Sequence, residues 1–198
     1  MLKKICSKLK KEKQPIKYDI LSPEEIGKLE EIDLEIVKLG LDEAKERLKD
    51  LLSTKNDLEA KANKLFSTQS FLATSIITIL GIISKLDYIS HVGLSITIGL
   101  IITIIILLLG MKKSVDAMKV SIYGTLGRHP STWLQNDIIN NKDNLGTILA
   151  YNLYDYCNLL DKSDLANKEK ATAIKDSIYC LSWSIAPLLI GVIISLIF

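Results

Sequence analysis

Three apolar stretches of membrane-spanning length stand out in the pattern of hydrophobic and polar positions along the chain. They occupy residues 65 to 84, 92 to 111 and 178 to 198. Each holds about 20 residues, and a helix of that length crosses a hydrocarbon core of about 30 Å. An open sheet would leave backbone groups unpaired in lipid. The pattern therefore predicts an all-α integral membrane protein with three transmembrane helices that extend into a cytoplasmic helical bundle.

Helical spacing continues on the N-terminal side of the first span. Ser22, Pro23 and Glu25 form a helix-start signal, because Ser22 can cap and Glu25 completes a capping box. Gly40 predicts a break or a shift of register, and one continuous helix is expected from about residue 42 to 84. Its apolar seam has a 3-4 spacing. The seam consists of Leu41, Ala44, Leu48, Leu51, Leu58, Ala62 and Leu65, with Lys55 in its one polar position.

A second seam is expected before the third span. The helix of the second span should continue to Leu126, and the last helix should run from about residue 144 into the third span. Its seam comprises Leu149, Leu153, Tyr156, Leu160, Asp164, Asn167, Ala171, Ile174, Ile178 and Leu181. Asp164 and Asn167 are expected to face Lys55 in a polar layer that sets the register. The alternatives are that this stretch turns to solvent, or that it contacts a second copy.

Basic residues near the ends of the spans predict the orientation. Lysines precede the first span, follow the second and precede the third, whereas Lys85 alone lies between the first two. The N-terminus is therefore expected in the cytoplasm and the C-terminus outside. The chain divides into a basic N-terminal segment (1–21), cytoplasmic helix or helices (22–64), a transmembrane hairpin (65–111), a cytoplasmic helical insert (112–177) and a C-terminal transmembrane helix (178–198). The first segment is either amphipathic against an anionic leaflet or a disordered tail.

Composition argues against several functions. The net charge of +2 is too small to indicate nucleic-acid binding. Cys6, Cys157 and Cys180 show no metal-ligand spacing, and His91 and His129 fall on opposite sides of the expected membrane. The sequence contains neither a Gly-rich phosphate loop nor a nucleophile elbow. The expectation is therefore a protein that is not an enzyme and that needs no metal or cofactor.

Each span also carries a stripe of small or weakly polar residues. Such stripes let helices approach closely in lipid, and they suggest a homo-oligomer in which Gly99 lies at a close contact. The stripes serve either for helix–helix packing alone or, in the first span above all, to line a polar path through the oligomer. The stripes are Ser67, Ser70, Thr74, Thr78 and Gly81; then Ser95, Gly99 and Thr103; then Ser184, Gly191 and Ser195, beside Pro187.

The layout resembles small transmembrane effectors of bacterial anti-phage systems, namely the Pycsar-type transmembrane effectors and the SLATT proteins. The resemblance covers about residues 40–198 and rests on topology, on Lys61-Ala62 before the first span, and on the run from Asn167 to Ala171 before the last. It implies a protein of the bacterial inner membrane that a nucleotide signal or an associated sensor activates to damage that membrane. No sensor domain is recognisable, so the trigger would be a partner protein or a ligand between helices.

Two functions are therefore expected from the sequence. The first is an oligomeric effector that permeabilises or depolarises the inner membrane when its cytoplasmic bundle is triggered. The alternative is a scaffold or regulatory subunit that recruits a cytoplasmic partner and conducts nothing. Both have the lipid bilayer as a partner, and neither binds nucleic acid.

Overall fold

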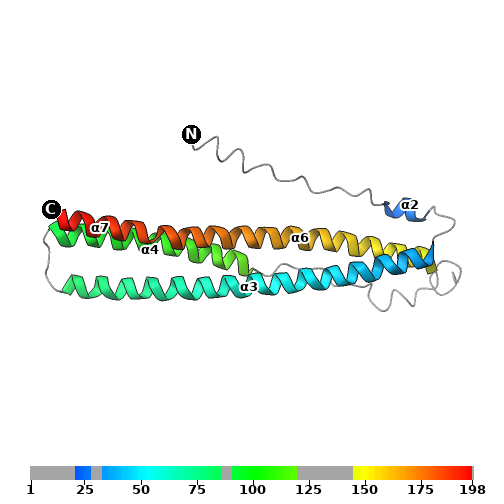
Figure 1. Cartoon of the computed structure of the whole chain (residues 1–198), viewed down its shortest axis with the longest axis horizontal. Coiled ribbons are helices and arrows are strands. Elements are labelled where there is room, and N and C mark those ends of the chain that lie inside the picture. The colour runs from blue at the N-terminus through cyan, green and yellow to red at the C-terminus, as the bar shows by residue number, and fades with distance from the viewer. Residues whose placement is uncertain (1–20, 28–32, 86–90, 120–144, 198) are drawn as a thin grey trace, which may run out of the picture.

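Long helices account for nearly all of the structure. The computed structural model describes residues 21–27, 33–85, 91–119 and 145–197. The helices are α2 (Pro23–Gly27), α3 (Leu34–Lys85), α4 (His91–Met118), α6 (Leu145–Trp183) and α7 (Ile185–Ile197). Figure 1 shows α3, α4 and the α6–α7 pair side by side along one axis, with the C-terminus beside the start of α4. The all-α prediction is confirmed for the described residues.

The helix α3 is a single rod of 52 residues, about 78 Å long. Asp33 caps its start, since Asp33 Oδ1 accepts hydrogen bonds from the amides of Glu35 (2.9 Å) and Ile36 (3.3 Å). The break expected at Gly40 is wrong, because α3 passes through that residue. A Cβ at Gly40 would lie 3.0 Å from Leu153 Cδ2. The glycine therefore marks a close approach of α6 and not an interruption.

The helix-start signal at Ser22 is real but begins a different helix from the expected one. The Ser22 amide donates to Glu25 Oε2 (2.7 Å), and the Glu25 amide donates to Ser22 Oγ (3.3 Å), which is a capping box. The backbone hydrogen bond from Ser22 lowers the pKa of Glu25, with a smaller contribution from the side chain of Ser22. This box caps the five-residue α2, whereas the long helix starts again at Leu34.

Two helix ends differ from the expectation. The helix α4 ends at Met118 and does not reach Leu126. Residues 120–144 of the expected cytoplasmic insert lie outside the described residues. The last helix is divided at Ser184 into α6 and α7. Pro187 explains the division, because it has no amide hydrogen for the carbonyl of Trp183 and its ring crowds that carbonyl.

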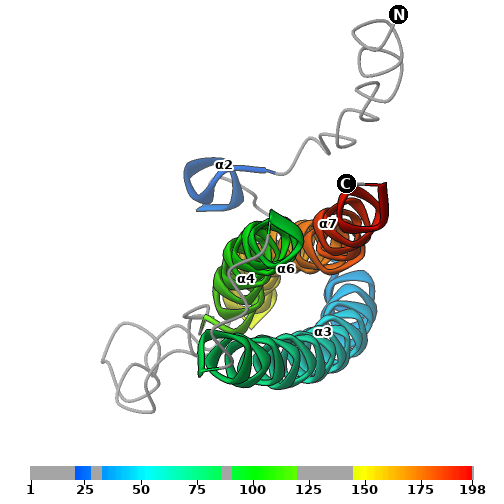
Figure 2. The same cartoon turned by 90° about the vertical axis from the view of Figure 1, so that its left-hand side faces the viewer.

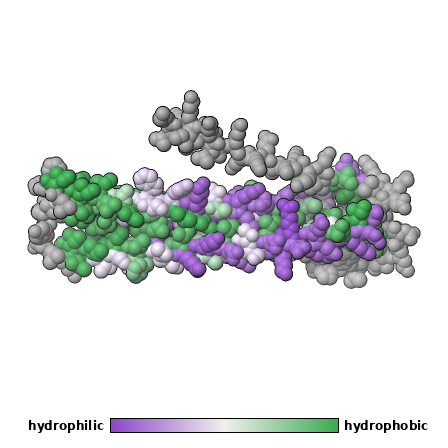
Figure 3. All heavy atoms as spheres, viewed as in Figure 1, coloured by the Kyte–Doolittle hydropathy of each residue, from purple (hydrophilic) through white to green (hydrophobic). Residues whose placement is uncertain are grey.

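Polarity changes along the rod, so that one half is apolar and the other polar (Figure 3). The apolar half contains α7 with the start of α4 and the end of α3. Three stretches are long and apolar enough to cross a membrane, within Leu34–Ile83, Leu94–Met118 and Leu145–Ser195. This confirms three potential transmembrane helices. Large side chains of this half face outward, for example Phe71 at 72% exposure.

The central helix of the apolar half is α4. Its main contacts are with α3, α6 and α7, whereas α3 makes its main contacts with α4 and α6. Figure 2, seen along the rod from the apolar end, shows α3 and α7 on different sides of α4. The apolar core consists of Ala73, Ile76, Leu100 and Leu107. Deeper in the rod, α3, α4 and α6 close around Ala62, Ala117 and Ile174.

The seam of α3 is confirmed, whereas the seam of α6 is partly wrong. Leu41, Ala44, Leu48 and Ala62 are buried, as the 3-4 spacing predicts. On α6, Ala171 and Ile178 are exposed, and their places inside are taken by Lys170 and Ser177. Hydrogen bonds to the neighbouring helices allow these polar groups to be buried. A prediction that looks for apolar residues therefore misses the inward positions in this part of α6.

Candidate functional site

Where α3, α4 and α6 run together, each contributes one polar side chain to the interior. These residues are Gln69, Ser114 and Ser177, all fully buried, and we call them the glutamine–serine layer. Gln69 Nε2 donates to Ser177 O and to Ser177 Oγ, at 3.1 Å each. The Ser114 and Ser177 hydroxyls lie 2.7 Å apart. Gln69 Oε1 accepts from both hydroxyls at 3.4 Å.

Gly110 makes the room that this layer needs. A Cβ at Gly110 would lie 2.4 Å from Gln69 Nε2 and 3.0 Å from Cys180 Cβ. Distances below 3 Å are not tolerated in a packed interior, so a side chain here would displace the Gln69 amide. The glycine therefore lets the longest side chain of the layer cross to α6.

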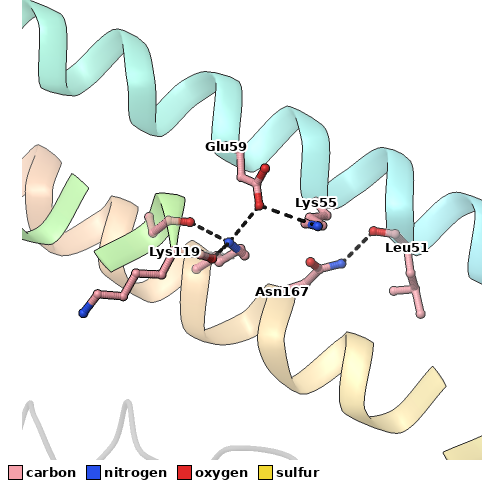
Figure 4. Close-up of polar contacts among 7 residues, drawn as sticks. Leu51, Lys55, Glu59, Lys119 and Asn167 are labelled. Atoms are coloured by element: carbon pink, nitrogen blue, oxygen red, sulfur yellow. Dashed lines mark hydrogen bonds and ion pairs between the residues drawn. The ribbon is translucent and has the colours of Figure 1, made fainter. Parts of the chain in front are cut away.

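A second polar layer lies further into the polar half (Figure 4). Its centre is Lys170 on α6, which is only 4% exposed. Lys170 Nζ donates to Glu59 Oε1 (2.9 Å), to Ala117 O (2.8 Å) and to Lys119 O (2.6 Å). We call Glu59, Lys170, Lys55 and Asn167 the ion-pair layer. An ammonium has three donors, and each of them has an acceptor here.

Lys170 therefore acts as a side-chain cap for α4. Ala117 and Lys119 lie at the C-terminal end of α4, where the last carbonyls lack partners within the helix. A cation at this end also interacts favourably with the helix dipole. Because Glu59 belongs to α3, one ammonium joins the end of α4 to the other two long helices.

The predicted polar layer is found in part. Asn167 is buried, and its Nδ2 donates to Leu51 O at 2.9 Å. Lys55 lies nearby and pairs with Glu59 at 3.9 Å. Asp164 is half-buried and forms an ion pair with Lys168 on its own helix at 2.6 Å. Glu59 and Lys170, which form the shortest ion pair of the layer, were not among the residues predicted from the sequence.

The small-residue stripes of the second and third spans meet each other. A Cβ at Gly99 would lie 2.8 Å from Pro187 O, and one at Gly191 would lie 2.9 Å from Ser95 O. Thr103 Oγ1 donates to Ser184 O at 3.1 Å, beside the division between α6 and α7. The close contact expected for Gly99 in an oligomer is therefore found between α4 and α7 of one chain. Ser195 lies beyond it and donates to Val192 O at 2.8 Å.

A groove of about 370 Å³ follows this crossing and opens outward. Its floor holds the two glycines, and branched apolar side chains form its walls. The wall residues are Ile98, Ile102, Ile190 and Ile194.

The stripe of the first span lies differently. Ser67, Thr74 and Thr78 are exposed, and a Cβ at Gly81 would meet nothing within 4 Å. Ser70 is half-buried and lies 4.0 Å from Met111 Sδ. Thr74 Oγ1 donates to Ser70 O and Thr78 Oγ1 donates to Thr74 O, both at 2.9 Å. Most of this stripe therefore points away from the other helices of the chain.

Sequence reasoning missed Gln69, Ser114, Ser177, Glu59 and Lys170. These residues share one feature. Each lies three, four or seven positions from a buried residue of its own helix, so helical spacing places it on the inward face. Ser163 follows the same rule: it is fully buried on α6, and its hydroxyl has no hydrogen-bond partner. Such buried polar residues can be found only if the inward positions are assigned by helical spacing alone, whether the residues there are apolar or polar.

The chemistry of these layers is structural. Within the part of the chain that the structure describes, no group of three His, Cys, Asp or Glu side chains could hold a metal ion. The layers join the three helices by hydrogen bonds and by the two ion pairs that share Glu59. No protein-family model, curated protein or solved structure matches this chain.

Proposed function

We propose that this chain is a three-span protein of the bacterial inner membrane that assembles into a homo-oligomer. When its cytoplasmic bundle is triggered, the assembly permeabilises or depolarises the membrane, as an effector of anti-phage defence. The N-terminus and the polar half lie in the cytoplasm, and the C-terminus lies outside. The trigger is a sensor protein or a nucleotide signal that acts on the cytoplasmic bundle.

One observation supports this proposal more than the others. The hydroxyl-bearing face of α3 is exposed at Ser67, Thr74 and Thr78, whereas the small residues of α4 and α7 are used within the chain. In lipid, small and weakly polar faces are where helices associate. A second copy that covers this face would bring hydroxyl groups from several chains together, and such a ring can line a polar path.

The continuity of the helices supports the triggering step. Both α3 and α6 run from the polar half into the apolar half without a break, so a displacement at one end is carried along the rod. The glutamine–serine layer and the ion-pair layer are the two levels at which these helices are joined by hydrogen bonds. Both levels lie between the bundle that receives the trigger and the spans.

A second candidate is a non-conducting scaffold, and one observation favours it. The hydroxyls of Thr74 and Thr78 already donate to carbonyls of their own helix. Hydroxyls that are satisfied in this way can face lipid without a partner. The face would then be a lipid-facing surface, and the polar half would serve only to recruit a cytoplasmic protein.

Replacing Thr74 and Thr78 together by valine separates the two functions. Valine keeps the shape and removes both hydroxyls, so an effector should still insert and assemble while dye uptake and depolarisation in expressing cells fall. The matched control replaces Thr68 by valine and Ser75 by alanine, since both hydroxyls make the same kind of bond on another face of α3. Leakage is compared at equal membrane abundance. Equal leakage from both variants and wild type would reassign the face to packing, and a wild type that never leaks would favour the scaffold.

A further inference from the structure

Three lysines from three different helices lie at the level where the rod changes from apolar to polar. The glutamine–serine layer sets this level, because it holds Gln69, Ser114 and Ser177 side by side. Along the rod, Lys64 lies about 8 Å and Lys175 about 3 Å from this layer on its polar side, whereas Lys112, on the antiparallel α4, lies about 3 Å from it on its apolar side. We call Lys64, Lys112 and Lys175 the lysine girdle.

All three side chains are exposed, and they come from α3, α4 and α6, so they point outward around the rod. A lysine at the end of an apolar stretch extends its ammonium to the membrane surface. Lys175 also stands 5.8 Å from the ring centre of Tyr179, an aromatic of the kind found at membrane interfaces.

The acidic side chains of this level are already paired with other lysines. Asp176 pairs with Lys113 at 3.3 Å, and Asp116 pairs with Lys119 at 2.6 Å. None of the ion pairs among the described residues includes a girdle lysine. Three lysines without an ion pair therefore lie within about 11 Å along the rod, although the net charge of the whole chain is only +2. Lys112 also lies near Asp116, where it adds a smaller effect to that of Lys119 in lowering the pKa of this carboxyl.

We propose that the lysine girdle binds the headgroups of anionic phospholipids on the inner side of the membrane. The inference rests on the membrane-spanning part of the proposed function and not on permeabilisation. Charge complementarity identifies the partner: a lysine close to an anionic leaflet gains about 1 kcal/mol, or about fivefold in affinity. By holding lipid phosphates at this level, the girdle also sets the depth of the rod in the bilayer.

Native mass spectrometry of the full chain tests the proposal. The protein is extracted with equal amounts of phosphatidylglycerol and phosphatidylcholine, and the retained lipids are counted. The test variant changes Lys64, Lys112 and Lys175 to glutamine. The control variant changes Lys38, Lys49 and Lys162 to glutamine, which removes the same charge from exposed positions of the polar half.

Wild type and control should retain phosphatidylglycerol over phosphatidylcholine by up to about 100-fold, since each of the three lysines adds about fivefold, and the girdle variant should lose most of this preference. Circular dichroism of all three proteins checks that the helices remain. An equal loss in both variants would show a general charge effect and overturn the site, as would an unchanged preference in the girdle variant. Displacement of the lipid by millimolar inorganic phosphate would identify a free-phosphate site instead. A wild type that retains neither lipid would overturn the lysine girdle as a lipid site and would leave the proposed function standing.

Discussion

In the polar half, α6 buries Asn167 and Lys170 against α3, whereas in the apolar half α3 turns Thr74 and Thr78 outward. The polar half thus places a few polar groups among a buried apolar seam, whereas the apolar half leaves weakly polar groups on an outer face. Buried positions serve close helix packing in the apolar half and specific polar pairing in the polar half.

Lipid explains the apolar half. Apolar side chains gain nothing by leaving lipid for a protein interior, so helices there associate by close packing and hydrogen bonds. The contacts of Gly99 with α7 and of Thr103 with Ser184 are of this kind. Large apolar side chains such as Phe71 and Ile77 are left outside.

Specific partners explain the polar half. A buried ion pair adds little net stability compared with an apolar replacement of the same shape. It does, however, penalise every register in which the charge loses its acceptors. Lys170 has acceptors on two other helices, so we interpret the ion-pair layer as a device that sets the register of α3, α4 and α6.

Lys170→Ala should have the largest effect, and it tests whether the polar half depends on its buried polar contacts. The substitution leaves Glu59 without its closest partner and two carbonyls of α4 without a donor, so the free energy of unfolding should fall by about 3 kcal/mol. Lys168→Ala is the control, since its ion pair with Asp164 is exposed and should be worth less than about 1 kcal/mol. Thermal unfolding in one detergent, followed by circular dichroism, measures both. Equal losses would mean that the buried position of Lys170 adds nothing.

Gly110→Ala should have the next largest effect. Its methyl group displaces the Gln69 amide from Ser177 and crowds Cys180, so a loss of about 2 kcal/mol is expected. Gly81→Ala is the matched control, because a Cβ there meets nothing within 4 Å. Its free energy of unfolding should not fall, and should rise by up to about 1 kcal/mol because alanine has the higher helix propensity.

The same unfolding measurement in one detergent compares the two glycine variants. A destabilised Gly81→Ala would show that the outer face of α3 is covered by another copy under those conditions. This result would place the oligomer contact on the face that carries the hydroxyl stripe.

Much of the fold could be predicted from the sequence, because long apolar runs and 3-4 spacing are local signals. The three apolar stretches, the continuity of α3 from residue 42 and its seam are of this kind. Beyond Leu160 the seam of α6 was predicted only in part, since Asn167 and Ile174 are buried as expected whereas Ala171 and Ile178 are exposed. There the inward positions hold Ser163, Lys170 and Ser177, and an apolar pattern does not reveal them.

The polar layers could not be predicted, because each depends on residues far apart in the sequence. Gln69 and Ser177 are separated by 108 positions, and neither is unusual by itself. Gly110 is likewise indistinguishable from an ordinary packing glycine until the Gln69 side chain is seen beside it. Burial, and not composition, identifies these residues.

Thiol labelling gives the smallest effect and compares the two halves directly. In a Cys6→Ser background, an impermeant maleimide added to opened membranes should reach Cys157 in the polar half and not Cys180 in the apolar half. Burial raises the pKa of Cys157, Asp161 raises it further, and Arg47 opposes both. A raised pKa means less thiolate at neutral pH, so the labelling rate should climb as the pH rises toward that pKa. Asp161→Asn should quicken labelling at pH 7. Labelling of Cys180 before detergent is added would contradict the division of the rod into a lipid-facing and a water-facing half.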